Sequence, residues 1–302
     1  MNPTSLIHIA LALILAPFFL GVINRTKAVF AGRTGRPLLQ AYYDILKLAR
    51  KGAVYSRTTT WVFRAGPVVG LAAVLTSLLL MPFGAQPGLL AFEGDFILFA
   101  GLLALLRFFT VVAALDTGSS FEGMGASREV QFSALAEPAL LLALASLAHL
   151  SGSFSLSNML AGISGSTWLH AGPALALAAA ALLVVFLTEN ARIPVDDADT
   201  HLELTMIHEV MVLDHSGPDL AFIVYGAVLK LWVLGALLVG ILLPPLAGPF
   251  LDAVLRVLGM VALAVVTGLI ESSMARLRLT HLPQLLAGAG VLSVLALLLV
   301  LR

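Results

Sequence analysis

Runs of about 20 apolar residues recur along the whole chain, and no other feature constrains its fold as strongly. Hydrophobic residues make up 60% of the 302 residues, and the mean hydropathy is +1.01, which excludes an ordinary soluble domain. The runs are apolar on every face, whereas the strands of a membrane barrel alternate polar and apolar side chains. The sequence therefore predicts an all-α, polytopic membrane protein in which residues 1–302 form a single integral membrane domain.

The apolar runs predict about eight transmembrane helices, since each run can cross a hydrocarbon core of about 30 Å. Residues 1–10 carry no Lys or Arg, so we expect no cleavable signal peptide at the start of the chain. The expected spans are roughly 5–23, 66–83, 96–115, 134–150, 172–188, 220–243, 250–270 and 282–301.

Charge is concentrated in four of the segments that join these spans. Of the 17 Lys and Arg residues, 13 lie in segments 24–65, 116–133, 189–219 and 271–281. The positive-inside rule places these four segments in the cytoplasm of a bacterial or archaeal cell and the N-terminus outside its cytoplasmic membrane. Most acidic residues share these segments, which that rule does not require. We therefore expect this face to be a docking surface or a polar cavity.

Segment 24–65 is the most basic of the four. Its polar residues Gln40, Asp44, Lys47 and Lys51 recur at helical spacing, and large apolar residues take the opposite side. This pattern predicts an amphipathic helix that lies at the membrane surface or under a partner subunit. Simple attraction to anionic headgroups is the alternative. Nucleic acid is not an expected partner, because no soluble domain presents the basic patch.

Segment 189–219 holds eight carboxylates, three histidines and one arginine. His201, His208 and His215 are seven residues apart, which would align them on one stripe of a continuous helix. A zinc site usually needs histidines at tighter spacing, so we expect no metal here. A hydrolase built from Ser216 and His215 is also disfavoured, because neighbours in sequence rarely face each other. The chain has no cysteine, which excludes thiolate-bound iron–sulfur clusters.

Proton transfer or electrostatic coupling is the interpretation that fits segment 189–219 best. Acids crowded beside a low-dielectric wall have raised pKa values, and histidine titrates near neutrality. On a helix, Asp199 and Glu203 would share one face, and Thr205 and Glu209 another, with Arg192 neutralising part of the cluster. In segment 116–133, small residues predict a tight turn that carries nearby charges toward other backbone.

Two expected spans contain a charge that no structural role demands. Arg107 and Lys230 each lie among apolar residues, and a charge at the centre of a bilayer costs on the order of 3 kcal/mol. We therefore expect both side chains to face the interior of the helix bundle, each with an acidic partner, and to take part in charge coupling.

Three stretches resemble one known family: GRPLLQAYYDILKLARKGAVYS, SSFEGMGASREV followed by ALAEPAL, and ENARIPVDDADTHLELTMIHEVMVLDHSGPDLA. They are similar to the membrane subunit of energy-converting [NiFe] hydrogenases of the formate hydrogenlyase and hydrogenase-4 type. That subunit is itself similar to subunit 1 of respiratory complex I, the NADH dehydrogenase subunit 1 family. The resemblance covers nearly the whole chain and implies a complex I subunit 1-like fold.

The resemblance implies a non-catalytic subunit that binds no cofactor itself. It would join a hydrophilic arm, with [NiFe] large and small subunits and an Fe–S subunit, to antiporter-like membrane subunits. Within the matching motifs, the residues expected to couple protons or charge are Glu122, Glu129, Glu137, Glu189, Arg192, Asp196, Asp197, Glu203 and Glu209. The sequence pattern adds Asp199, His208, Arg107 and Lys230. The residues expected to dock partners are Arg33, Arg36, Tyr42, Tyr43, Asp44, Lys47 and Arg128.

Two alternatives stay open. The chain could be the quinone-chamber subunit of a complex I-like NADH or ferredoxin:quinone oxidoreductase. Complex I subunit 1 typically reads ETNRAPFDLPEAESELVAG where this chain has residues 189–219, and that departure weakens the quinone hypothesis. A stand-alone proton-coupled transporter would also explain charges within spans, but the chain shows no repeated halves of the kind many transporters have.

Overall fold

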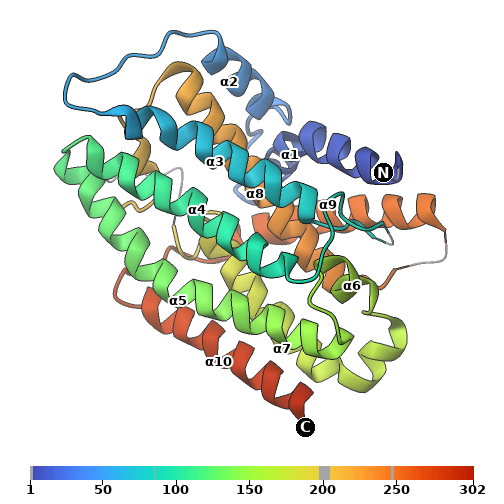
Figure 1. The fold of residues 1–302 in the computed structure, drawn as a ribbon. Coiled ribbons are helices and arrows are strands. Elements are labelled where there is room, and N and C mark those ends of the chain that lie inside the picture. The colour runs from blue at the N-terminus through green and yellow to red at the C-terminus, as the bar shows by residue number, and fades with distance from the viewer. Residues whose placement is uncertain (1–2, 85, 197–204, 246–247) are drawn as a thin grey trace.

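A computed structural model describes residues 3–84, 86–196, 205–245 and 248–302 (Figure 1). Eight of its helices are long and apolar enough to cross a membrane, which confirms the predicted all-α polytopic fold. These helices are α1 Pro3–Phe30, α3 Trp61–Leu80, α4 Asp95–Asp116, α5 Ser120–Ser151, α7 Gly165–Glu189, α8 Gly217–Leu242, α9 Pro249–Ser273 and α10 Leu282–Leu301. Three shorter elements complete the described chain: α2 Gln40–Ala49, α6 Leu156–Ala161 and the 3-10 helix η1 Glu209–Val212.

Helix α8 forms the centre of the bundle. It packs against α1, α2, α3, α7 and α9, and nearly every residue from Val228 to Ile241 is buried. Helix α3 packs along α4, while α10 covers α5 and α7 (Figure 1). Because α8 has neighbours on all sides, a charge on its buried part must find its partner within the protein.

The alternation of the helices gathers the charged connections at one end of the bundle. We call this end the charged face; its described residues are the connections 31–60, 117–119, 190–196, 205–216 and 274–281. Asp116 at the end of α4 caps α3 there, because its carboxylate accepts hydrogen bonds from the Thr60 backbone N (2.7 Å) and hydroxyl (2.9 Å). Two of the spans are thereby locked together where they reach this face.

The connection between α4 and α5 is shorter than the sequence predicts. We expected a tight turn over 116–133, but α5 already begins at Ser120 and continues for 32 residues. Glu122, Arg128 and Glu129 therefore lie on a helix, and Pro138 lies inside α5. The small residues of this region allow close packing: a Cβ at Gly125 would lie 2.3 Å from Val210 Cγ1.

The amphipathic helix predicted from Gln40, Asp44, Lys47 and Lys51 is confirmed as α2, although α2 ends at Ala49; the histidine stripe is not confirmed. Residues 205–216 form turns and the short helix η1, so no continuous helix joins His208 to His215. His201 lies outside the described residues, as do Asp197, Asp199 and Glu203.

Candidate functional site

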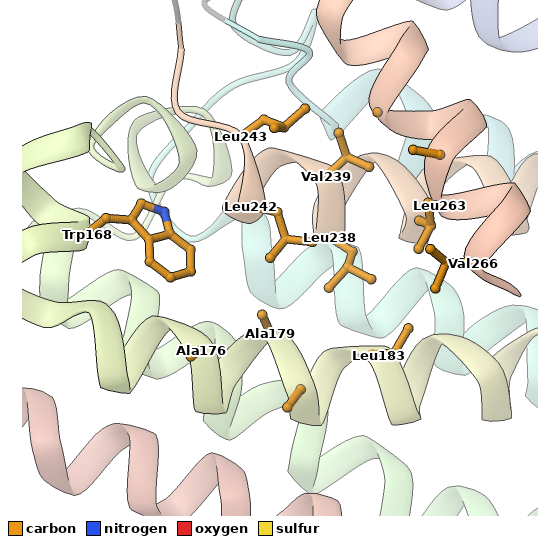
Figure 2. Close-up of a pocket in the computed structure, with 13 residues that line it drawn as sticks. Trp168, Ala176, Ala179, Leu183, Leu238, Val239, Leu242, Leu243, Leu263 and Val266 are labelled. Carbon is orange, nitrogen blue, oxygen red and sulfur yellow. The ribbon is translucent and has the colours of Figure 1, made fainter. Parts of the chain in front are cut away.

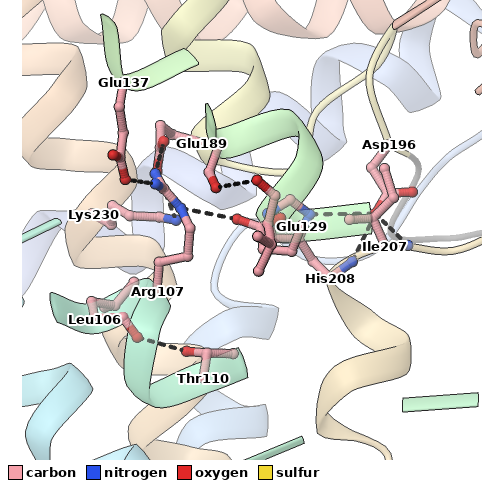
Figure 3. A network of polar contacts seen from close by, with 12 residues as sticks. Leu106, Arg107, Thr110, Glu129, Glu137, Glu189, Asp196, Ile207, His208 and Lys230 are labelled. Atoms are coloured by element: carbon pink, nitrogen blue, oxygen red, sulfur yellow. Dashed lines mark hydrogen bonds and ion pairs between the residues drawn. The ribbon is translucent and has the colours of Figure 1, made fainter. Parts of the chain in front are cut away.

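The buried side chain of Arg107 on α4 contacts three carboxylates (Figure 3). Its Nε lies 3.1 Å from Glu129 Oε1, and its two terminal nitrogens bond to Glu137 and Glu189. The guanidinium offers five N–H donors in a planar fork, so it can bind several carboxylates at once. Arg107 is 7% exposed, and the predicted acidic partner within the bundle is confirmed threefold.

Lys230 on the central helix shares one of these carboxylates. Its Nζ lies 3.7 Å from Oε2 of Glu189, while the other oxygen of Glu189 bonds to Arg107. Lys230 is 8% exposed, and a buried ammonium without a partner would be costly. Glu189, the last residue of α7, thus bridges two buried cations, and the acidic partner predicted for Lys230 is also confirmed.

His208 extends the cluster toward the charged face. Its Nε2 lies 3.2 Å from Glu129 Oε2, and its Nδ1 lies 3.5 Å from Asp196 Oδ2, which is a charge contact rather than a well-formed hydrogen bond. Asp196 also accepts hydrogen bonds from the backbone N of Ile207 (3.2 Å) and of His208 (3.1 Å). The imidazole ring is therefore held with a carboxylate at each nitrogen.

This geometry shifts the pKa values of His208 and Asp196 in the directions that favour a protonated histidine beside an ionised carboxylate. Burial alone would lower the pKa of His208, but the charges of Glu129 and Asp196 more than offset it, so the pKa is raised. Burial would likewise raise the pKa of Asp196, yet His208 and Arg276 outweigh it, so that pKa is lowered. The imidazolium form of His208 is the one that this site stabilises.

Arg276, in the connection between α9 and α10, ends the series at the charged face. One of its terminal nitrogens lies 2.9 Å from Asp196 Oδ1 and also bonds to the carbonyl oxygen of Thr205. Seven side chains then form a continuous series of alternating charge, which we call the ion-pair chain: Lys230, Glu189, Arg107, Glu129, His208, Asp196 and Arg276.

Glu137 is a branch of the ion-pair chain that reaches the outside of the bundle. Its carboxylate bonds to Arg107, yet 43% of its side chain is exposed, against 10% for Glu129 and 5% for Glu189. With Glu137 included, four carboxylates face four cations, of which His208 counts only when it is protonated. The network is therefore electrically neutral only with His208 in its imidazolium form.

Arg192 belongs to a separate cluster among the described residues, and its predicted role in neutralising Asp199 and Glu203 falls on acids outside them. Its guanidinium lies 3.5 Å from Glu271 Oε1, and Lys27 Nζ lies 3.1 Å from Glu271 Oε2. Glu122 is also apart from the ion-pair chain: it is buried near the start of α5 and accepts a hydrogen bond from the Asp214 backbone N (3.0 Å). Glu209 begins η1.

The residues predicted to dock partners divide into two groups. Arg33, Arg36, Tyr43 and Lys47 are exposed. The others make contacts within the chain: Tyr42 donates its hydroxyl to the Ile14 carbonyl, Arg128 donates to the Met206 carbonyl (2.7 Å), and Asp44 accepts from Gln40 (2.8 Å). Their docking role stays a prediction.

Sequence reasoning missed Lys27, Glu271 and Arg276, although segment 271–281 was placed on the charged face. Within the described residues, no group of three or more histidines and carboxylates is arranged to hold a metal ion. The disfavoured zinc site therefore gains no support from the described part of segment 189–219.

An apolar groove of about 460 Å³ lies between α7, α8 and α9 (Figure 2), and none of its lining residues belongs to the ion-pair chain. Small residues such as Ala179 and Gly259 open it, and Leu238 forms part of its wall. The indole N–H of Trp168, which also lines it, is already donated to the Ile241 carbonyl (3.2 Å). Its lining therefore suits hydrocarbon rather than a polar headgroup.

Comparison with protein families matches residues 4–301 to the family described as NADH dehydrogenase. The chain is 33% identical over 283 residues to formate hydrogenlyase subunit 4 of Escherichia coli (strain K12), covering 91% of each chain. It is 32% identical over 279 residues to hydrogenase-4 component C of the same strain, covering 90% of this chain and 87% of that protein.

A more distant relative is a subunit of the NADH-quinone oxidoreductase of Rubrobacter xylanophilus, with 29% identity over 225 residues, covering 72% of this chain and 66% of that protein. Among solved structures, the fold is similar to a chain of the membrane-bound sulfane sulfur reductase, an archaeal respiratory membrane complex. The TM-score is 0.82 over 98% of both chains, and at 20% identity this likeness shows the fold alone.

These matches confirm the resemblance predicted from the three motifs. The family match spans nearly the whole chain, and two subunits of hydrogenase complexes are more than 30% identical to it. The chain therefore belongs to the NADH dehydrogenase subunit 1-like family, as an integral membrane subunit of the kind found in hydrogenase and complex I-like respiratory complexes.

Proposed function

We propose that this chain is the membrane anchor and proton- or ion-coupling subunit of a multisubunit membrane-bound hydrogenase complex. It would link a hydrophilic arm that carries the [NiFe] and Fe–S centres to antiporter-like membrane subunits, with its charged face in the cytoplasm. The two Escherichia coli relatives belong to hydrogenase complexes, which supports this choice. The observation that carries the proposal is the ion-pair chain, which connects the charged face to the central helix.

The physical basis is the alternation of charge along the ion-pair chain. Two unit charges about 4 Å apart interact by about 4 kcal/mol at an effective dielectric of 20, so each member strongly affects the proton affinity of the next. A redox change in an arm docked near Arg276 or Asp196 would therefore alter the protonation of His208. No residue of this chain needs to take part in the redox chemistry itself.

The net charge of the ion-pair chain and Glu137 indicates where a proton released by His208 is compensated. When the His208 ring gives up a proton, four carboxylates face three cations, and the network carries one excess negative charge. Glu129 then holds Arg107 more strongly, which weakens the hold of Arg107 on Glu137. Glu137 is half-exposed, so it is the carboxylate best placed to take up a compensating proton or to pass one to a neighbouring membrane subunit.

The variant Glu129→Gln tests this proposal, because it cuts the ion-pair chain between His208 and Arg107. We expect the purified complex in proteoliposomes to keep hydrogen turnover while ion transport per turnover falls at least tenfold. The matched control is Asp95→Asn, a buried carboxylate that bonds to Ser155 and Leu156 outside the charged face. A normal ion gradient in Glu129→Gln, or an equal loss in the control, would contradict the proposed coupling role.

A second candidate is the quinone-chamber subunit of a complex I-like oxidoreductase, which the similarity to the NADH-quinone oxidoreductase of Rubrobacter xylanophilus favours. Mass spectrometry of the lipids extracted from the purified complex distinguishes the two. Stoichiometric quinone together with quinone-dependent electron transfer would favour this second candidate; co-purifying hydrogenase subunits and no quinone would favour the first.

A further inference from the structure

The connection between α1 and α3 carries an unbalanced positive charge. Residues 24–65 contain nine Lys and Arg residues and a single acidic residue, Asp44. Helix α2 lies within this segment and packs against α1 and α8, with Ala41 buried in the contact. Lys27 pairs with Glu271, and the ion-pair chain uses none of these cations, so the positive charge of α2 requires a different explanation.

The face of α2 that points away from the bundle combines apolar and basic side chains. Tyr43, Leu46, Lys47 and Arg50 follow one another at helical spacing and line a surface concavity of about 430 Å³. Tyr43 is 59% exposed and Leu46 is 56% exposed, and both cations are exposed. Four residues from two turns thus present an open hydrophobic edge beside two positive charges.

Both cations are free to bind a ligand. The nearest acidic residue in sequence, Asp44, accepts a hydrogen bond from Gln40 (2.8 Å). Neither Lys47 nor Arg50 forms an ion pair with any residue that the structure describes. Lys47 also lies in the last turn of α2, where the helix dipole favours a cation.

We propose that this face of α2 is a binding site for the phosphate headgroup of an anionic phospholipid. Lys47 and Arg50 contact the phosphate, and Tyr43 and Leu46 pack against the glycerol and the first carbons of the acyl chains. Charge complementarity identifies the occupant: clusters of basic residues directly beside a membrane span attract anionic lipid by about 1 kcal/mol for each residue near the surface.

The apolar residues favour a lipid over an acidic surface of a protein. A soluble acidic partner would leave Tyr43 and Leu46 against water or against its own polar groups, whereas a lipid offers both a charged and an apolar part. Trp61, at the start of α3 on the same charged face, is 72% exposed, as expected of an aromatic side chain at a membrane–water boundary. The site is independent of proton coupling, so either proposal can fail without the other.

Native mass spectrometry of the full-length chain, purified with its co-purifying subunits, provides the test. Phosphatidylglycerol and phosphatidylcholine with identical acyl chains are titrated separately. We expect selective binding of phosphatidylglycerol, and about 30-fold weaker binding in the variant Lys47→Gln/Arg50→Gln, because two contacts of about 1 kcal/mol are lost. Binding of phosphatidylcholine should change little.

The control variant Arg57→Gln/Arg278→Gln removes two exposed cations from the same face but outside α2. It should bind phosphatidylglycerol like the unmodified chain. An equal loss in the control, undiminished binding in Lys47→Gln/Arg50→Gln, or equal affinity for the two lipids would each overturn the proposal. Loss of a co-purifying subunit from the α2 variant, with lipid binding intact, would overturn it in favour of a protein-docking surface.

Discussion

Glu189 lies 3.7 Å from Lys230 across the interface of α7 and α8, and the same carboxylate bonds to Arg107 on α4. One acidic side chain thus holds two cations inside a membrane-spanning bundle. Each cation alone would be costly there, and the carboxylate between them makes both tolerable. Three separate helices must meet for this arrangement to form, so the site and the fold depend on each other.

Glu189→Gln should destabilise the protein strongly, by about 3–5 kcal/mol, because it removes a shared counter-charge from two buried cations. The thermal midpoint of the purified chain in detergent measures the loss. The double variant Glu189→Gln/Lys230→Met removes one cation as well and should recover a large part of it. A single variant as stable as the unmodified chain, or a double variant less stable than the single, would contradict the bridging role.

His208 should give the stability of the chain an alkaline limit. Its raised pKa means that its contribution is fully present below about 6.5, the ordinary histidine value, and is lost as the pH rises through the raised pKa. We expect the thermal midpoint to fall over that window above neutrality. In His208→Gln the midpoint should be lower and nearly independent of pH there; an unchanged alkaline fall would show that another group is responsible.

Asp196 and His215 should instead make the stability of the chain fall at acid pH. The lowered pKa of Asp196 gives a contribution that is present above about 3.9 and is lost as the pH falls through the lowered value. Burial lowers the pKa of His215 to about 4, and its ring stacks on Phe63 with centroids 3.9 Å apart. Because the unfolded chain binds this proton more readily, stability should decline between about pH 6.5 and pH 4.

His215→Phe separates the two acid effects, because it keeps an aromatic ring against Phe63 and removes the titrating group. The decline between pH 6.5 and pH 4 should shrink by on the order of 3 kcal/mol, while the loss through Asp196 at lower pH stays. The thermal midpoint measured across pH 3–7 in both proteins is the readout. An identical acid profile would mean that His215 is not buried as a neutral ring.

The spans and α2 could be predicted from the sequence because they depend on local patterns, apolar runs and helical spacing. The start of α5 could not: residues 120–127 are mostly small or polar, and the close contact of Gly125 with Ile207 and Val210 is visible only in three dimensions. The requirement that Arg107 and Lys230 have acidic partners followed from the cost of burial alone. The identity of those partners did not, because Glu129 and Glu189 are supplied by other helices.

The partner of Arg276 at the charged face could not be predicted from the sequence either. Its segment was correctly grouped with the other charged connections, but its pairing with Asp196 links positions 80 residues apart. Sequence spacing carries no information about such a contact. Arg192 pairs with Glu271, 79 positions along the chain, which sequence spacing could not predict either; the acids Asp197, Asp199 and Glu203 beside it lie outside the described residues.

Gly217 should be intolerant of a side chain for two independent reasons. Its φ of +57° lies in the left-handed region, and a Cβ there would lie 2.6 Å from the Gly52 carbonyl oxygen. Gly217→Ala should cost more than the roughly 1 kcal/mol of the backbone strain alone. Gly118→Ala is the matched control, since its φ is +71° but nothing lies within 4 Å. Equal thermal midpoints for the two variants would show that the contact with Gly52 is unimportant.

Tyr225 should stabilise α1 at the point where a proline interrupts it. Pro17 has no N–H, so the carbonyl of Leu13, four residues earlier, loses its usual partner within the helix. The Tyr225 hydroxyl donates to that carbonyl at 3.0 Å. Tyr225→Phe leaves the carbonyl unsatisfied and should cost about 1–3 kcal/mol, with faster amide hydrogen exchange in α1 near Pro17. Tyr43→Phe, which removes a hydroxyl from an exposed ring, should leave exchange in α1 unchanged; if both variants behave alike, the hydrogen bond does not hold α1 against α8.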